Sequence, residues 1–181
     1  MALRKWVKLS SERVFESQFL SVNKNVWQLP NGEINDNYYS FVRPDYVIMV
    51  GTDQAGNILV ERSFRQAVND FVYEMPAGFI ESGEDIEDTA RREFTEETGY
   101  PVVSVDYQGM FYPLAGPTAM QGHLVFLEFD SNPPPSPDRE AEETIECSIL
   151  SPAEVKQMVL ENQMKCMGSI AAVGRYFLKN E

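Results

Sequence analysis

The sequence predicts an α+β domain in which a mixed β-sheet lies between helices. Three observations indicate this class: strand-like segments fill most of the N-terminal half, one amphipathic helical segment follows them, and further strands precede two C-terminal helices. This order builds a layered fold, because each helix buries its apolar stripe against a face of the sheet. At 181 residues, the chain is long enough to bury a full hydrophobic core.

The first strands are expected to form an antiparallel hairpin. Residues 13–42 alternate polar and apolar side chains on both sides of a Pro-Asn-Gly turn at residues 30–32. Such alternation around a turn is typical of paired strands that are buried on one face. We therefore divide the chain into an N-terminal β extension, residues 1–44, and a main domain, residues 45–181.

The main domain has further strand and helix signals. The expected strands are 45–51, 58–64, 71–75, 102–112, 122–130 and 144–150. A helix is expected over 151–162, because Ser151 is a good N-cap and Pro152 suits the first helical position. The last helix, 168–178, places Ile170, Val173 and Phe177 on one face.

Between these strands, a helix is predicted from about Asp85 to Thr98. Ser82 followed by Asp85 has the pattern of a capping box, while Gly99 and Pro101 end the helix. At about 100° per residue, its apolar stripe consists of Ile86, Ala90 and Phe94.

Two glutamates, Glu93 and Glu97, fall inside this apolar stripe, and Glu96 lies at its margin. A like-charge pair at i, i+4 near the negative end of a helix dipole is unfavourable, and burying an unpaired carboxylate costs far more. Two explanations are open. Either the helix presents a solvated acidic face, which is the common case, or a divalent cation neutralises the carboxylates. Oxygen-only ligands favour Mg²⁺ or Mn²⁺.

The spacing of residues 78–100 favours the cation. Gly78, five residues, Glu84, seven residues and then "REFTEETGY" match every fixed position of the Nudix box, so the chain resembles a Nudix hydrolase. The upstream segment "ERSFRQAVNDFVYEMPAG" is similar to the ADP-ribose pyrophosphatase and nucleoside diphosphate sugar hydrolase branch. The downstream "FYPLAGPTAM" is a partial match, because Ala115 stands where close relatives have a second proline.

This resemblance implies an α/β/α sandwich and a Mg²⁺-dependent enzyme, with Mn²⁺ as a substitute. It implies four metal ligands, namely the backbone carbonyl of Ala77 and the side chains of Glu93, Glu96 and Glu97. A bound metal would lower the pKa of a water molecule and neutralise phosphate oxygens. Gly78 would let the chain pass close to the metal and substrate.

The remaining catalytic residues also come from the resemblance. Arg92 is expected to orient a ligand carboxylate, and Glu96 belongs to both the metal set and the catalytic set. The Pro-rich segment 131–143 is either a solvated loop or, as in relatives, the carrier of a catalytic glutamate; Glu142 and Glu143 match best and Glu140 is an alternative. Glu84 either helps to position a metal or favours the helix start.

Three residues besides Gly78 are candidates for binding substrate. Arg65 resembles an arginine that relatives aim at phosphates, although an exposed arginine at a strand end is the common alternative. Trp6 and Tyr38 resemble aromatic residues that stack on the nucleobase, although aromatic side chains more often serve packing. A homodimer through the N-terminal hairpin is implied by the resemblance alone.

Composition narrows the class of partner. A net charge of −13 argues against nucleic acid, and no segment approaches the ~18 apolar residues that cross a membrane. Cys147 and Cys166 form no CxxC pair and His123 is the sole histidine, so a structural zinc site is not expected. Free thiols and a basic N-terminus without an apolar core favour the cytoplasm over secretion.

The sequence thus predicts hydrolysis of the pyrophosphate bond of a nucleoside diphosphate sugar. ADP-ribose is favoured as substrate, which would give AMP and ribose 5-phosphate, and GDP-mannose or other nucleoside diphosphate sugars remain open. The alternative is a non-catalytic Nudix module that senses a nucleotide sugar or binds a partner. Such a module would be expected to lose motif carboxylates, and none is missing here.

Overall fold

The computed structural model describes residues 3–139 and 144–180. In it, the chain forms two compact units. The larger unit comprises Asp45–Phe111 and Gly122–Glu181, and the smaller comprises Met1–Pro44 with Tyr112–Gln121. The segment 112–121, which connects two strands of the larger unit, therefore clusters with the N-terminal unit.

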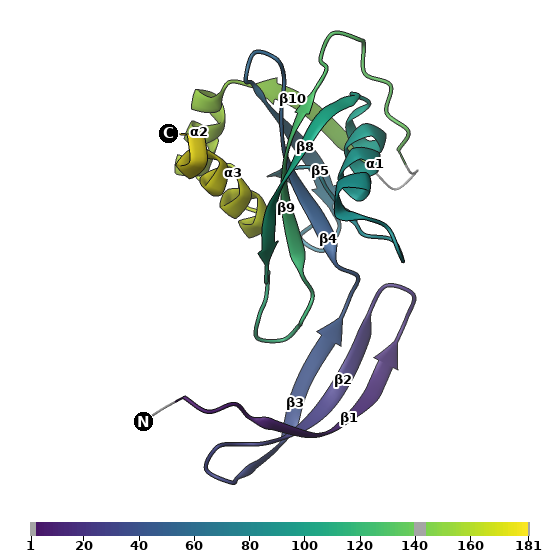
Figure 1. The fold of residues 1–181 in the computed structure, drawn as a ribbon, viewed down its shortest axis with the longest axis vertical. Coiled ribbons are helices and arrows are strands. Elements are labelled where there is room, and N and C mark those ends of the chain that lie inside the picture. The colour runs from purple at the N-terminus through teal and green to yellow at the C-terminus, as the bar shows by residue number, and fades with distance from the viewer. Residues whose placement is uncertain (1–2, 140–143, 181) are drawn as a thin grey trace. The chain divides into compact units, whose positions relative to one another are not determined.

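The larger unit is an α/β/α sandwich around a mixed sheet, as the sequence predicts (Figure 1). Five strands follow the order β10-β5-β4-β9-β8, with β6 beside β5 and β7 beside β4. β4 and β9 are parallel, and the other pairs are antiparallel. The strands are β4 (Tyr46–Thr52), β5 (Ile58–Arg65), β6 (Asp70–Glu74), β7 (Ala77–Phe79), β8 (Val102–Phe111), β9 (Gly122–Phe129) and β10 (Ile145–Leu150).

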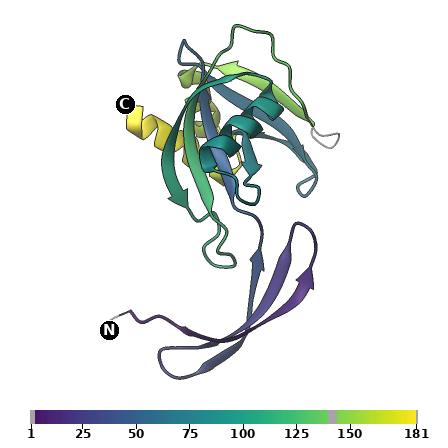
Figure 2. The ribbon, with the colours of Figure 1, turned by 45° about the vertical axis from the view of Figure 1, so that its right-hand side comes forward.

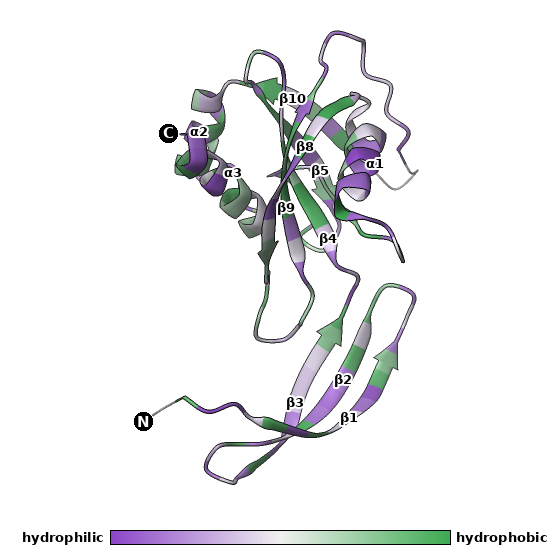
Figure 3. Ribbon diagram, in the orientation of Figure 1, coloured by the Kyte–Doolittle hydropathy of each residue, from purple (hydrophilic) through white to green (hydrophobic). Residues whose placement is uncertain are grey.

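Alternation along the central strands creates two hydrophobic cores. In β4, Val47 and Met49 pack in the core beneath α1, while Ile48 and Val50 pack in the core beneath α2 and α3. Successive side chains of a strand point to opposite faces, so a strand buried on both sides is apolar at consecutive positions. Figure 3 shows this hydrophobic stretch of β4 between the helices, whereas much of α1 is hydrophilic.

Helix α1 (Ile86–Thr98) covers one face of the sheet alone, as the turned view in Figure 2 shows. Its N-cap is Asp85, whose carboxylate accepts the Glu87 N–H, so the expected capping role of Ser82 was wrong. Gly99 ends the helix in the left-handed conformation with a φ of 77°, which glycine adopts without strain. Ala90 and Phe94 are fully buried in the core below.

Helices α2 (Pro152–Leu160) and α3 (Met167–Asn180) cover the opposite face (Figure 1). α2 begins as predicted, with Ser151 as N-cap, Pro152 at the start and Glu154 completing a capping box. In the described part of the chain, no helix is both long and apolar enough to cross a membrane.

The smaller unit contains the predicted antiparallel hairpin, and a further strand extends it to a three-stranded sheet. Its strands are β1 (Val7–Glu16), β2 (Ser21–Gln28) and β3 (Ile34–Val42), in the order β1-β2-β3. Segment 112–121 joins β3 through the Phe41 N–H, which donates to the Pro117 carbonyl, and the Tyr38 hydroxyl, which donates to the Gly116 carbonyl. Among residues 3–44, Asn25 alone is classed as buried, so this sheet has little core of its own.

Candidate active site

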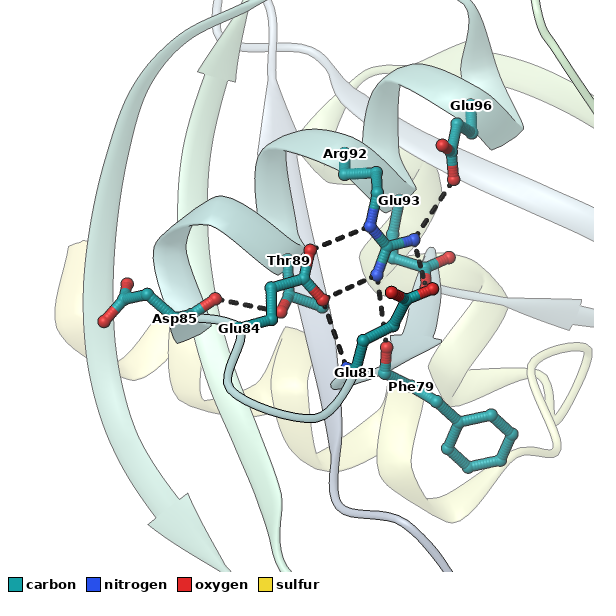
Figure 4. Close-up of polar contacts among 8 residues, drawn as sticks. All are labelled: Phe79, Glu81, Glu84, Asp85, Thr89, Arg92, Glu93 and Glu96. Atoms are coloured by element: carbon teal, nitrogen blue, oxygen red, sulfur yellow. Dashed lines mark hydrogen bonds and ion pairs between the residues drawn. The ribbon is translucent and has the colours of Figure 1, made fainter. Parts of the chain in front are cut away.

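Arg92 is the centre of an ionic network at the start and middle of α1 (Figure 4). Its Nε and Nη2 bond the two Glu84 carboxylate oxygens, each at 2.8 Å, and Nη2 also donates to the Phe79 carbonyl at 3.4 Å. Its Nη1 bonds Glu93 at 2.9 Å and Glu96 at 3.2 Å. These five bonds match the five N–H groups of a guanidinium, so the Arg92 side chain is committed to protein groups.

Glu93 is held against the strand β7. A Cβ added to Gly78 would lie 1.9 Å from the Glu93 Cδ and 2.2 Å from its Oε2, so only glycine leaves room for this carboxylate. Gly78 itself is fixed in the sheet, because it pairs with Val47 of β4. The motif glycine and the motif glutamate, 15 positions apart, are therefore in direct contact.

Glu97 is buried beneath the last turn of α1, with 7% of its surface exposed. The charges of Glu97 and of Glu61 in β5, which is 2% exposed, both act on the thiol of Cys147 in β10, whose Sγ lies 4.0 Å from the Glu61 Oε1. Glu96 is more open, with a side chain that is 45% exposed. In α1, Glu97 is thus buried and Glu96 is partly exposed. This agrees with the predicted apolar stripe, which contains Glu97 and has Glu96 at its margin.

Arg65 closes this acidic region from the end of β5. Its Nη2 and Nε donate to the Glu74 Oε2 at 2.5 and 3.0 Å, which joins β5 to β6. The Glu74 hydrogen bond raises the pKa of the Arg65 guanidinium, and the charges of Glu97 and Glu61 add to this effect. The sequence-predicted Arg65 is therefore close enough to Glu97 for the two charges to interact, and two of its N–H groups are already bonded to Glu74.

Two pKa values report on these surroundings. Hydrogen bonds from Arg92 lower the pKa of Glu84 from 4.5 to about 2, so Glu84 stays ionised across the usual pH range. Burial, together with the charge of Glu61, raises the pKa of the Cys147 thiol to about 12. Cys147 is therefore a protonated structural thiol rather than a nucleophile.

The donor chemistry of this region fits a divalent metal ion. The expected ligands, Ala77, Glu93, Glu96 and Glu97, offer only oxygen atoms, which suits Mg²⁺ or Mn²⁺, and the Glu93 carboxyl group occupies the space that the missing Cβ of Gly78 leaves. Within residues 3–139 and 144–180, however, no three Asp, Glu, His or Cys side chains converge as a metal-binding group. In this arrangement the Arg92 guanidinium binds the carboxylates of Glu93 and Glu96 (Figure 4).

The aromatic candidates lie in the smaller unit. Trp6 and Tyr38 line a hollow of about 310 Å³ together with Trp27, a residue that the sequence analysis did not single out. The rings of Trp27 and Tyr38 meet edge to face at 6.1 Å, and the Lys8 ammonium lies 5.1 Å from the centre of the Trp27 ring. The predicted pair is thus part of a three-ring cluster.

Two buried carboxylates escaped the sequence analysis. Glu61 and Glu74 are buried carboxylates in strands, and β5 could have signalled Glu61, because its alternation places that residue on the α1 face with Leu59. Of the predicted catalytic residues, Glu142 and Glu143, like the alternative Glu140, lie outside the described residues. His123 is in β9, where its Nδ1 lies 3.0 Å from the Tyr107 hydroxyl.

Comparisons with known proteins agree with this fold. Residues 42–167 match the model of the NUDIX domain family. The chain is 32% identical over 142 residues to the CMP-5'-(N-acetyl-N-hydroxy-3-aminopropyl)phosphonate hydrolase of Streptomyces rubellomurinus, covering 77% of this chain and 68% of that one. It is 30% identical over 108 residues to the ADP-ribose pyrophosphatase of Bacillus subtilis, covering 60% of this chain and 58% of that one. A crystal structure of an ADP compounds hydrolase superposes with a TM-score of 0.84 at 19% identity, covering 99% and 97% of the two chains, which shows the shared fold.

Proposed function

Because this chain belongs to the Nudix family of hydrolases, we propose that it hydrolyses the pyrophosphate bond of a nucleoside diphosphate sugar with the help of a divalent metal ion. The observation that carries this proposal is the environment of the motif helix: Glu97 is buried, and Glu93 fits against a backbone that only glycine leaves open. Burying ionised carboxylates in this way destabilises a fold unless nearby cations compensate their charge.

Mg²⁺ is the proposed metal, with Mn²⁺ as a substitute. Glu93, Glu96, Glu97 and the Ala77 carbonyl would hold it, and when bound it would activate a water molecule and neutralise phosphate oxygens. Arg92 orients carboxylates rather than contacting substrate, since its five bonds to protein groups use its donors. We assign the general base to Glu142 or Glu143, by resemblance.

ADP-ribose is the proposed substrate, giving AMP and ribose 5-phosphate. Its support is the similarity to the Bacillus subtilis ADP-ribose pyrophosphatase. GDP-mannose and other nucleoside diphosphate sugars are the next candidate substrates. Cytidine compounds also belong in the substrate panel, because one relative is named as a hydrolase of a CMP-linked phosphonate. Arg65 is proposed to contact a phosphate, and Trp6 and Tyr38, with Trp27, to stack on the nucleobase.

We also propose a cytoplasmic homodimer. The two cysteines are free, as in a reducing compartment. Strand β1 is exposed along its whole length, including Val7, Leu9 and Phe15, each more than half exposed. A small sheet without its own core needs a covering surface, and a second copy would supply one.

The test is Glu97→Gln, assayed with ADP-ribose and Mg²⁺ against the substrate panel, with and without EDTA. A neutral amide is a poor metal ligand, so turnover should fall at least about 100-fold while the melting temperature stays within a few degrees of wild type. Chelation should abolish the wild-type reaction, and added Mg²⁺ should restore it. A wild-type protein that binds nucleotide sugars without cleaving any of them would instead support the non-catalytic module.

A further inference from the structure

Arg139 connects the last turn of α1 to strand β10. Its Nε donates to the Glu97 carbonyl at 2.6 Å, its Nη1 to the Ile145 carbonyl at 2.7 Å and its Nη2 to the Cys147 Sγ at 3.3 Å. The planar guanidinium suits this task, because it directs rigid donors to acceptors on separate elements. One side chain thus joins the helix that carries the motif glutamates to the strand beside Glu61.

The backbone before Arg139 caps the same helix end. The Asp138 N–H donates to the Glu96 carbonyl at 2.9 Å, and the Ser136 N–H donates to the Gly99 carbonyl at 3.2 Å. A Cβ on Gly99 would lie 2.3 Å from the Ser136 nitrogen, so the segment passes directly over the glycine that ends α1. Segment 136–139 therefore supplies partners for carbonyl groups that an α-helix leaves unsatisfied.

Arg139 also supplies a charge that α1 lacks. The last turn of the helix has no basic residue, although it carries Glu96 and Glu97 at the negative end of the helix dipole. A cation at this end is favourable, and the Arg139 guanidinium is bonded to the carbonyl of Glu97 itself. The position and the charge of Arg139 both act on the turn that bears the proposed metal ligands.

We propose that Arg139 is a positioning residue, which holds the Glu96–Glu97 turn in place relative to β10 and so sets the geometry of the metal-binding carboxylates. This inference rests on the proposed function, since it assigns metal binding to those carboxylates. Loss of groups that orient metal ligands typically weakens metal affinity or activity 10- to 100-fold. The bond from Arg139 to α1 is accepted by the Glu97 backbone carbonyl, so Arg139 acts on this turn through the backbone.

Three variants test this role: Arg139→Ala, Arg139→Lys and the control Arg91→Ala. Arg91 is a matched control because it lies on α1 and also bonds a distant backbone carbonyl, with its Nη1 3.2 Å from the Val102 oxygen. Lysine keeps the charge of Arg139 but cannot reach three separated acceptors. Mn²⁺ affinity is measured without substrate, from the electron paramagnetic resonance signal of free Mn²⁺, and kcat and KM for ADP-ribose are measured at saturating metal.

We expect Arg139→Ala to weaken Mn²⁺ binding about tenfold and to lower kcat about tenfold, with KM changed less than twofold. Arg139→Lys should lie between it and wild type, and Arg91→Ala should keep both values within twofold. Wild-type Mn²⁺ affinity in Arg139→Ala and Arg139→Lys would overturn the proposal, and so would an equal loss in Arg91→Ala.

The outcome stays informative in two difficult cases. If Arg139→Ala does not fold, Arg139→Lys decides, because a wild-type Mn²⁺ affinity in that variant refutes the geometric role. If the wild-type protein does not cleave ADP-ribose, the proposed substrate fails on its own, while Mn²⁺ affinity still tests Arg139.

Discussion

Gly78→Ala separates the stability of the fold from the placement of one carboxylate. The added Cβ would lie 1.9 Å from the Glu93 Cδ, whereas ordinary contacts begin at 3.4 Å, so the carboxyl group has to move by about 1.5 Å or more. Gly78 cannot retreat, because its strand is paired with Val47. The flexible Glu93 side chain therefore moves, which also disturbs its 2.9 Å bond to Arg92.

The expected result is a folded but inactive protein. Moving the end of a flexible side chain lies at the low end of overpacking costs, about 1 kcal/mol, which lowers the melting temperature by roughly 2–4 °C in a domain of this size. A displacement of about 1 Å in a catalytic group can cost on the order of 100-fold in rate. Activity on ADP-ribose with Mg²⁺ should therefore fall about 100-fold or more, while circular dichroism shows a native fold.

Gly174→Ala is the control. Apart from its chain neighbours and the backbone of its own helix, no described atom lies within 4 Å of a Cβ added there, and alanine favours the helix α3, so this variant should be at least as stable as wild type and equally active. If Gly78→Ala keeps more than a third of wild-type activity, or if it unfolds, the reasoning about Glu93 is refuted.

Two further predictions concern ionisation. The pKa of Glu84 is lowered in the folded state, from 4.5 to about 2, so its contribution to stability is complete above about pH 4.5 and is lost as the pH falls towards 2. Urea unfolding at pH 6, 4.5 and 3 should therefore show a smaller acid-induced loss in Glu84→Gln than in wild type, and parallel losses would contradict the Arg92–Glu84 assignment. The raised pKa of the Cys147 thiol, about 12, predicts that iodoacetamide at pH 8 labels Cys147 at least tenfold more slowly in the native protein than in urea, by mass spectrometry. Equal rates would show that the thiol is not buried as described.

Local patterns in the sequence were sufficient to predict those features of the helices that depend on residues close together along the chain. The stripe of Ala90 and Phe94 and the burial of Glu97 follow from helical periodicity, and the start of α2 follows from Ser151 and Pro152. The Nudix family, too, was predicted from the spacing of the motif, and the match over residues 42–167 confirms it. The one local error concerns the start of α1, where Asp85 rather than Ser82 caps the helix, because both residues have a suitable oxygen and the backbone decides between them.

What the sequence alone determined is the identity and order of the charged groups: which residues share the face of α1, and which glycine precedes them. Tertiary structure alone decided which groups meet, since it brings Glu93 to Gly78, Arg65 to Glu74, and Arg139 to both Glu97 and Cys147. The physical reason is that helical and strand periodicity act over a few residues, whereas these contacts depend on the pairing of strands and on segments passing over the ends of distant helices.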